Sequence, residues 1–372
     1  MTIRSLKTQV AFASCLAAIF LLQIVHAAPL LTSRSSSNDP LKFSGIARVK
    51  AIGGGQSLYS PTYKLSYYGG PLLNNVQVTN IYMGKNVHYR SKIDAFTKFY
   101  VTSKQMDMII QEYSPPKKKP IGYGSFVGSY IEMNQSLSEL SEWYESEIKT
   151  YFRNLTIRGS IKPNNNSYYG LYFAPNVTAI QVFQGFTLRS CQDFCGFHGA
   201  VDISDLKITN TPYLYYAVYP DQSGLCMGGC GISSDPFANT CSVTGHELAE
   251  VITDPAMTMV NSTRPQAPLA WYDDGTNAGG EIGDLCNTLE STLTDKKGVK
   301  WTVQKIWSNK YKKCLAELPA PTKPTSKPNR SSPSPSPPAS KPKTKYKVIK
   351  GLSKINRKLK KRKVRKSNGN KG

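Results

Sequence analysis

The chain has 372 residues and a formal net charge of +23, which would indicate nucleic-acid binding if it were spread over a fold. Residues 318–372 hold 18 of the 47 Lys and Arg and no Asp or Glu, which leaves +5 on residues 1–317. That is an ordinary value, so we expect no nucleic-acid partner. Beyond the N-terminal segment no stretch is apolar enough to cross a membrane, and the sequence predicts no transmembrane segment.

Residues 1–27 have the pattern of a secretory signal peptide. Arg4 and Lys7 precede an apolar run from Val10 to Val25, and Val25-His26-Ala27 is a small-residue cleavage site. The sequence therefore predicts a secreted protein, extracellular or bound to a cell wall, in which residues 28–42 form a flexible N-terminal segment.

Acceptor triplets for N-glycosylation agree with that route. They begin at Asn134, Asn154, Asn165, Asn176, Asn261 and Asn329.

Cysteine usage also fits an oxidising compartment. Once Cys15 leaves with the signal peptide, seven cysteines remain, and three disulfides plus one free thiol are the simplest account. The segments CQDFC and CMGGC resemble half-sites of a zinc ribbon, but secretion favours bridges. We expect Cys286 to pair with Cys314 and to close the C-terminal segment onto the core.

Residues 43–317 are long enough for one large α/β domain. Apolar spacing predicts helices over 91–113 and 137–152, and a further helix around His246. Aromatic and β-branched runs predict strands over 76–83, 168–174, 179–183, 213–219 and 301–307. Strands that alternate with helices indicate an α/β fold. We expect a single mixed-sheet domain, stapled by disulfides and containing a zincin-like His-Glu helix.

The sequence from His246 to Glu250, His-Glu-Leu-Ala-Glu, nearly matches the metallopeptidase motif H-E-x-x-H. Residues four apart share one face of a helix, so His246 and Glu250 are candidate ligands of one metal ion. Glu247 then occupies the position of a general base for a metal-bound water, which makes it the candidate catalytic residue.

Further candidate ligands lie on the same helix and on distant segments. Asp254 follows Glu250 by one turn, and Glu281 and Asp284 lie in a glycine-rich acidic loop, with Asp273 and Asp274 as other acidic candidates. His198 is the remaining histidine in a cysteine-pinned, glycine-flanked position. A set with few histidines and several carboxylates suits Zn²⁺ less well than a histidine-rich set, and it also accepts Ca²⁺ or Mn²⁺.

Structural interpretations of these residues compete with the metal site. Thr244 followed by Glu247 fits a capping box at a helix N-terminus, and His246 with Glu250 fits a plain i,i+4 hydrogen bond. Asp254 before Pro255 is also typical of a helix end. No nucleophile elbow, P-loop or dinucleotide fingerprint is found in the chain.

Two segments resemble the EXORDIUM, or phosphate-induced protein 1, family. They are Leu65–Leu73 (LSYYGGPLL) with the following Val76-Gln77-Val78 and Tyr82–Lys85, and Cys195–Gly199 (CGFHG). Plant members have Trp-Tyr where this chain has Tyr82-Met83, and His246–Cys286 is more similar to microbial members. The resemblance implies a secreted, wall-associated protein linked to growth, with no settled biochemical activity.

The basic C-terminal tail is not part of that family's pattern. Residues 318–345 form a Pro/Ser/Lys-rich linker that we expect to be disordered, and 346–372 are a basic tail that can form an amphipathic helix. Concentrated positive charge binds polyanions, so the expected partner is an anionic cell-wall polymer or membrane surface. We therefore expect a secreted, non-catalytic, growth-related protein; the alternative is a zincin-like metal-dependent hydrolase that uses Glu247.

Overall fold

The computed structural model describes residues 46–48, 63–183, 185–207, 209–259, 268–273 and 280–320. The predicted signal peptide, the segment 28–42 and nearly all of the linker and basic tail lie outside these residues. Chain contacts divide the protein into Met1–Pro319 and Ala320–Gly372, and the architecture described below belongs to the first unit.

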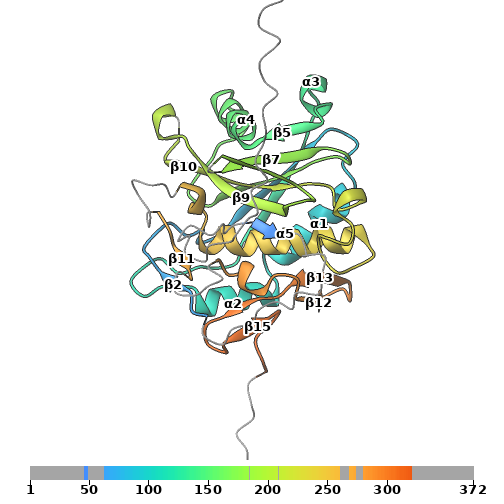
Figure 1. Ribbon diagram of the computed structural model, residues 1–372. Helices are drawn as coiled ribbons and strands as arrows, with labels where there is room; N and C mark the ends of the chain where they lie inside the picture. The colour runs from blue at the N-terminus through green and yellow to red at the C-terminus, as the bar shows by residue number, and fades with distance from the viewer. Residues whose placement is uncertain are drawn as a thin grey trace, which may run out of the picture. The chain divides into compact units, whose positions relative to one another are not determined.

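The main sheet has six strands in the order β1-β9-β10-β6-β3-β4. Strands β10, β6, β3 and β4 are parallel to one another, whereas β9 runs antiparallel to both β10 and β1. The fold is therefore mixed α/β, as the sequence predicts, although several smaller sheets accompany the main one (Figure 1). The strands are β1 (Ile46–Arg48), β3 (Gln77–Met83), β4 (Ser125–Glu132), β6 (Ser167–Tyr172), β9 (Phe194–Asp202) and β10 (Tyr213–Tyr219).

The central strands are buried on both faces, which explains their nearly continuous aromatic and apolar sequences. Alternate residues of β10 enter two different cores: Tyr215 and Tyr219 belong to one, and Tyr216 and Val218 to the other. The strands predicted over 76–83, 168–174 and 213–219 are confirmed as β3, β6 and β10.

One face of the sheet is covered by helix α4 (Glu145–Ile157) and by a three-stranded sheet of β5 (Glu142–Tyr144), β7 (Thr178–Phe183) and β8 (Phe186–Arg189). The prediction of one helix over 137–152 is wrong in part. The short helix α3 (Gln135–Ser138) ends early, and Trp143 lies in β5, where it pairs with Ala179. Helix α4 begins only at Glu145, where the Glu147 carboxylate accepts a hydrogen bond from the Tyr144 amide.

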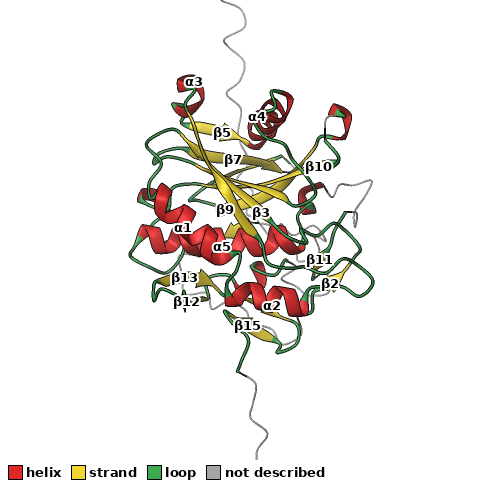
Figure 2. Ribbon diagram, turned by 180° about the vertical axis from the view of Figure 1, so that it is seen from behind, coloured by secondary structure: helices red, strands yellow, loops and turns green. Residues whose placement is uncertain are grey.

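The other face packs against α1 (Arg90–Tyr100) and α5 (Pro236–Thr253). The predicted helix over 91–113 is two helices, because Ser103 caps a new helix, α2 (Lys104–Glu112), by accepting a hydrogen bond from the Met106 amide. Figure 2 shows α1 and α5 side by side below the main sheet. Short 3₁₀ turns complete the helical elements: η1 (Ser204–Leu206), η2 (Gly224–Cys226), η3 (Met257–Met259) and η4 (Asp284–Cys286).

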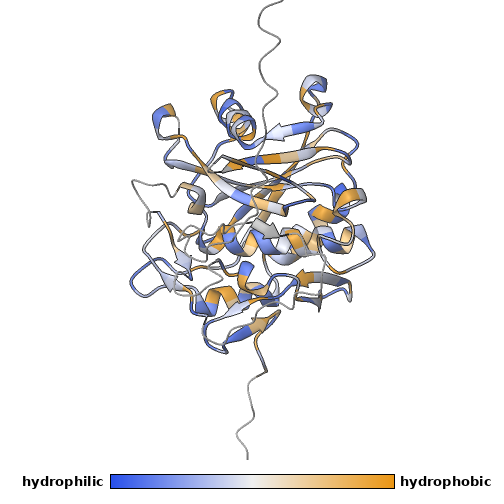
Figure 3. Cartoon of the chain, in the orientation of Figure 1, coloured by the Kyte–Doolittle hydropathy of each residue, from blue (hydrophilic) through white to orange (hydrophobic). Residues whose placement is uncertain are grey.

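Small hairpins lie on the far side of α5. They are β12 (Glu290–Thr294) with β13 (Lys300–Gln304) and β14 (Ile306–Ser308) with β15 (Lys313–Leu315); β2 (Ser66–Tyr67) pairs separately with β11 (Trp271–Tyr272). The strand predicted over 301–307 is divided at Lys305, whose amide donates to the Leu289 carbonyl. Helix α5 contacts both β13 and the main sheet, so it is enclosed from two sides. It shows both hydrophobic and hydrophilic residues in Figure 3, although nearly all of them are buried.

Three disulfides confirm the expected count and the predicted Cys286–Cys314 pair. The CQDFC and CMGGC segments are joined by Cys191–Cys226 and Cys195–Cys230, so they are bridge partners and not zinc half-sites. Among the described cysteines, Cys241 is the free one, and it is buried in α5. The glycosylation asparagines that the structure describes, namely Asn134, Asn154, Asn165 and Asn176, are all exposed.

Candidate metal centre

Helix α5 carries His246, Glu247 and Glu250 into the interior. The helix begins at Pro236, and the Asp235 side chain caps it by accepting a hydrogen bond from the Phe237 amide at 3.0 Å. Thr244 therefore lies in the middle of the helix, and the capping-box interpretation of Thr244 and Glu247 is wrong. The three side chains are 0% exposed, so their charges need partners inside the fold.

His198 reaches the same place from strand β9. Its Nδ1 lies 3.1 Å from Oε2 of Glu247 and 3.6 Å from Oε2 of Glu250. Its Nε2 lies 3.2 Å from the backbone carbonyl of Asp254. Because a carbonyl can only accept, Nε2 carries a proton, and the ring is held with Nδ1 directed at two carboxylates.

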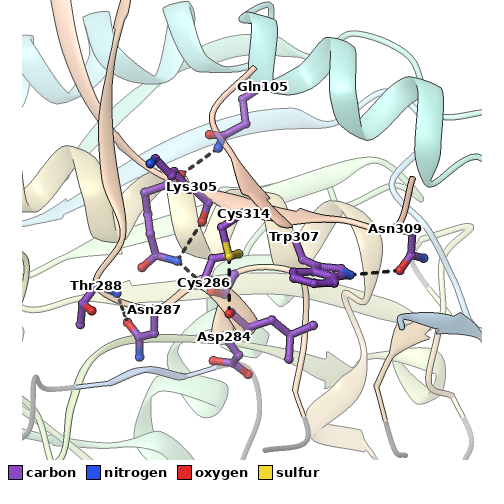
Figure 4. Close-up of a disulfide and its surroundings, with 12 residues drawn as sticks. Gln105, Asp284, Cys286, Asn287, Thr288, Lys305, Trp307, Asn309 and Cys314 are labelled. Carbon is purple, nitrogen blue, oxygen red and sulfur yellow. Dashed lines mark hydrogen bonds between the residues drawn. A yellow bond between two sulfur atoms is a disulfide. The ribbon is translucent and has the colours of Figure 1, made fainter. Parts of the chain in front are cut away.

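The loop Gly280–Cys286 brings Glu281 and Asp284 to the cluster. The Trp307 amide donates to the Ile282 carbonyl, the Gln304 side chain donates to the Gly283 carbonyl, and Cys314 is bonded to Cys286. Figure 4 shows this disulfide together with Asp284 and Trp307. The C-terminal hairpins thus fix the position of the acidic loop against α5.

The amides of this loop hold the Glu250 carboxylate. Gly283 and Asp284 donate from their backbone N–H groups to Oε1 of Glu250, at 3.2 and 3.0 Å. A Cβ at position 283 would lie 2.7 Å from Nδ1 of His246 and 2.8 Å from Oε1 of Glu250, so any other residue here would displace one of these side chains. The sequence prediction missed these backbone donors; the glycines in Gly-Glu-Ile-Gly-Asp were the available signal.

His246 packs on the other side of the same carboxylate. Its Nε2 lies 3.1 Å from Oε1 of Glu250 and 3.8 Å from Oδ1 of Asp284. The predicted i,i+4 pair of His246 and Glu250 is therefore present as an ion-pair contact. Among the described residues, Nδ1 of His246 has no hydrogen-bond partner. Two sets of three ligand atoms lie within 4.8 Å of one another: His198 with Glu247 and Glu250, and His246 with Glu250 and Asp284.

Asp254 and Glu281 lie at the margin of these sets. Asp254 ends α5, as predicted, and its Oδ1 accepts a hydrogen bond from the Ala270 amide at 2.9 Å. Oε1 of Glu281 lies 3.6 Å from Nε2 of His198. In the part of the chain that the structure describes, both oxygens of Glu281 and Oδ2 of Asp254 are buried without a hydrogen-bond partner. The Asp273 carboxylate instead accepts a hydrogen bond from the Lys64 amide, and the Asp273 backbone forms an antiparallel β-bridge with Gly280. Asp274 lies outside the described residues.

The cluster contains more buried carboxylates than buried imidazoles. Burial raises the pKa of Asp254 to about 8 and that of Glu281 well above its usual range. Burial lowers the pKa of His246, but the combined effect of Glu250, Glu247 and Asp284 outweighs burial and raises the pKa to about 10. Burial also lowers the pKa of His198, but its contacts with Glu247, Glu250 and the Asp254 backbone together raise it. Among the described residues, the cluster has two imidazoles and five carboxylates, so bound protons or a further positive charge are needed to balance it.

Comparison with protein-family models, with curated proteins and with solved structures found no match to this chain. Among the described residues, no helix combines the length and the apolar character needed to cross a membrane.

Proposed function

We propose that this protein binds a divalent cation in the buried centre between α5, β9 and the Gly280–Cys286 loop, and that the cation stabilises the fold. The single observation that carries the proposal is the orientation of His198. Its Nε2–H donates to a backbone carbonyl, while Nδ1 faces the carboxylates of Glu247 and Glu250. Histidine ligands of metals are typically oriented by such a bond from the second ring nitrogen.

The donor set favours zinc over calcium. Calcium takes oxygen ligands almost exclusively, whereas zinc and manganese accept imidazole nitrogen together with carboxylate oxygen. Both His198 and His246 direct a ring nitrogen at carboxylates of the cluster. We therefore propose Zn²⁺ as the preferred ion, with Mn²⁺ as the closest competitor.

A structural role is favoured over hydrolysis because the centre is enclosed. Structural zinc sites are closed, whereas catalytic sites keep a position open to substrate. His198, His246, Glu247 and Glu250 are 0% exposed, and the side chain of Asp284 is 8% exposed. Glu247 also lies within hydrogen-bond distance of His198, which engages the carboxylate that hydrolysis would require as a base.

The metal proposal is tested by the zinc content of the purified secreted protein after dialysis against Zn²⁺ and then against buffer at pH 8. We expect bound zinc in the wild type and a loss of at least tenfold in affinity in His198→Ala and His246→Ala. His88→Ala is the matched control, because the His88 side chain is 48% exposed and pairs with Asp221. A wild-type protein that retains no zinc contradicts the proposal.

The second candidate function is a zincin-like hydrolase. The observation in its favour is that Glu247 lies next to the first ligand on α5 and points into the cluster. This function predicts zinc-dependent cleavage of unfolded protein substrates that falls by at least 100-fold per bound zinc in Glu247→Gln. An equal rate in the two proteins removes the hydrolase.

The cellular role that we propose follows from the sequence. The signal-peptide pattern and the EXORDIUM resemblance favour a secreted, wall-associated, growth-related protein, and the basic residues of 346–372 favour attachment to an anionic polymer or membrane surface. Salt-dependent binding to isolated cell walls tests the attachment. We expect release by about 0.5 M salt and by truncation after Pro319. Retention after both treatments contradicts it.

A further inference from the structure

We infer that the centre holds two divalent cations bridged by the carboxylate of Glu250. This inference rests on the proposed cation binding and adds its stoichiometry and its bridging ligand. It follows from the way in which the two oxygens of one buried carboxylate face two different histidines.

The first cation position is formed by Nδ1 of His198, Oε2 of Glu247 and Oε2 of Glu250. Oε2 of Glu250 is buried and has no hydrogen-bond partner among the described residues, so it is available to a cation. The distances from Nδ1 to the two oxygens are 3.1 and 3.6 Å. They are close to the separation of about 3.3 Å between neighbouring ligand atoms of a tetrahedral zinc ion with bonds of about 2.0 Å.

The second position is formed by Nε2 of His246, Oε1 of Glu250 and Oδ1 of Asp284. The distances from Nε2 to these oxygens are 3.1 and 3.8 Å. Nε2 of His246 is buried and directed at these carboxylate oxygens. A cation between the nitrogen and the oxygens would compensate the carboxylate charge that faces it.

Glu250 is held in a bridging orientation by the protein itself. The amides of Gly283 and Asp284 donate to Oε1, and the Nδ1 of His198 faces Oε2. Carboxylates that bind metals are themselves commonly hydrogen-bonded by surrounding groups. The amides therefore fix which oxygen belongs to which histidine.

Two cations also account for the ligands and the charge better than one. Among the described residues, each set of three close ligand atoms contains one histidine, and no set contains both. One divalent cation compensates two of the five carboxylate charges, whereas two compensate four.

The inference is tested by native mass spectrometry of the zinc-loaded, disulfide-bonded protein. We expect two zinc ions in the wild type, one in Glu247→Gln, one in Asp284→Asn and none tightly held in Glu250→Gln. The control is Glu142→Gln, which changes an exposed carboxylate paired with Arg189 and should leave two. Near-ultraviolet circular dichroism checks that each variant is folded.

A second measurement uses the wild type alone, so it does not depend on the folding of any variant. Titration of metal-depleted protein with Co²⁺, followed by visible absorption, should show a break at two equivalents. One equivalent in both experiments overturns the bridged pair and leaves the proposed cation binding intact. No bound metal in either experiment overturns both.

Discussion

The two faces of the main sheet bury different kinds of side chain. On the α4 face, β6 and β10 present aromatic and apolar residues, such as Tyr216, whose ring lies 5.2 Å from that of Phe152. On the α5 face, β9 presents His198 to three buried acidic residues. The α4 face is stabilised by buried apolar area, which does not depend on pH, whereas the stability of the α5 face depends on the charge state of its buried histidines and carboxylates.

Loss of packing on the α4 face should have the largest effect on stability. Phe152 is 0% exposed and contacts the rings of Tyr151, Tyr169 and Tyr216. Phe152→Ala should lower the free energy of unfolding by about 3–5 kcal/mol, because it leaves a cavity in a packed core. Denaturant unfolding measures this loss, and the zinc content of the folded variant should equal that of the wild type. A loss of zinc would show that the two faces are coupled.

A single methyl group should disturb the α5 face. Gly283→Ala places a Cβ within 3 Å of both His246 and Glu250, so one of these side chains must move. We expect a cost of about 1–3 kcal/mol and at least tenfold weaker zinc binding. The control is Gly298→Ala, in an open turn with φ of 82°, which should cost about 1 kcal/mol and leave zinc binding unchanged. Equal zinc affinity in the two variants would contradict the described packing of Gly283.

The pH dependence should separate the faces without any mutation. In metal-depleted protein, the folded-state pKa values of Asp254 and His246 are raised to about 8 and about 10. Groups with raised folded-state pKa values stabilise the fold below their unfolded values, and this stabilisation is lost as the pH rises. The metal-depleted protein should therefore melt at a lower temperature at pH 9 than at pH 5.

Zinc should reverse that trend, because it replaces protons on the ligands and binds more tightly as the pH rises. Thermal melts with and without zinc at pH 5, 7 and 9 test this expectation. The difference between the two melting temperatures should be greatest at pH 9. A difference that does not change with pH would mean that zinc does not bind at the titrating cluster.

The sequence was informative where one residue type dominates a segment. The aromatic run of β10 and the His-Glu pair on α5 are both visible without a structure. Strand β9 was missed because Cys195, Gly196 and Gly199 are not typical strand residues, yet this strand carries His198. The helix predicted over 137–152 failed because Trp143 matches a helical spacing although it pairs in a sheet.

The sequence largely predicted which residues form the cluster, but not their geometry. It pointed to a glycine-flanked histidine, a His-Glu helix and an acidic, glycine-rich loop as parts of one site. One carboxylate oxygen of Glu250 faces His198 and the other faces His246. This arrangement depends on side-chain torsions and on a contact between His198 and Glu250, which are 52 positions apart in the chain. No local pattern encodes such a contact.

The hairpins at the end of the domain determine when the centre can form during synthesis. The loop that presents Asp284 is held by Gln304, Trp307 and Cys314, which are among the last residues of the domain to leave the ribosome. A nascent chain that ends before them has the α5 histidine and glutamates but lacks the groups that close the loop over them. The cation binding that we propose is therefore expected only after the domain has been made to its end and the Cys286–Cys314 disulfide has formed.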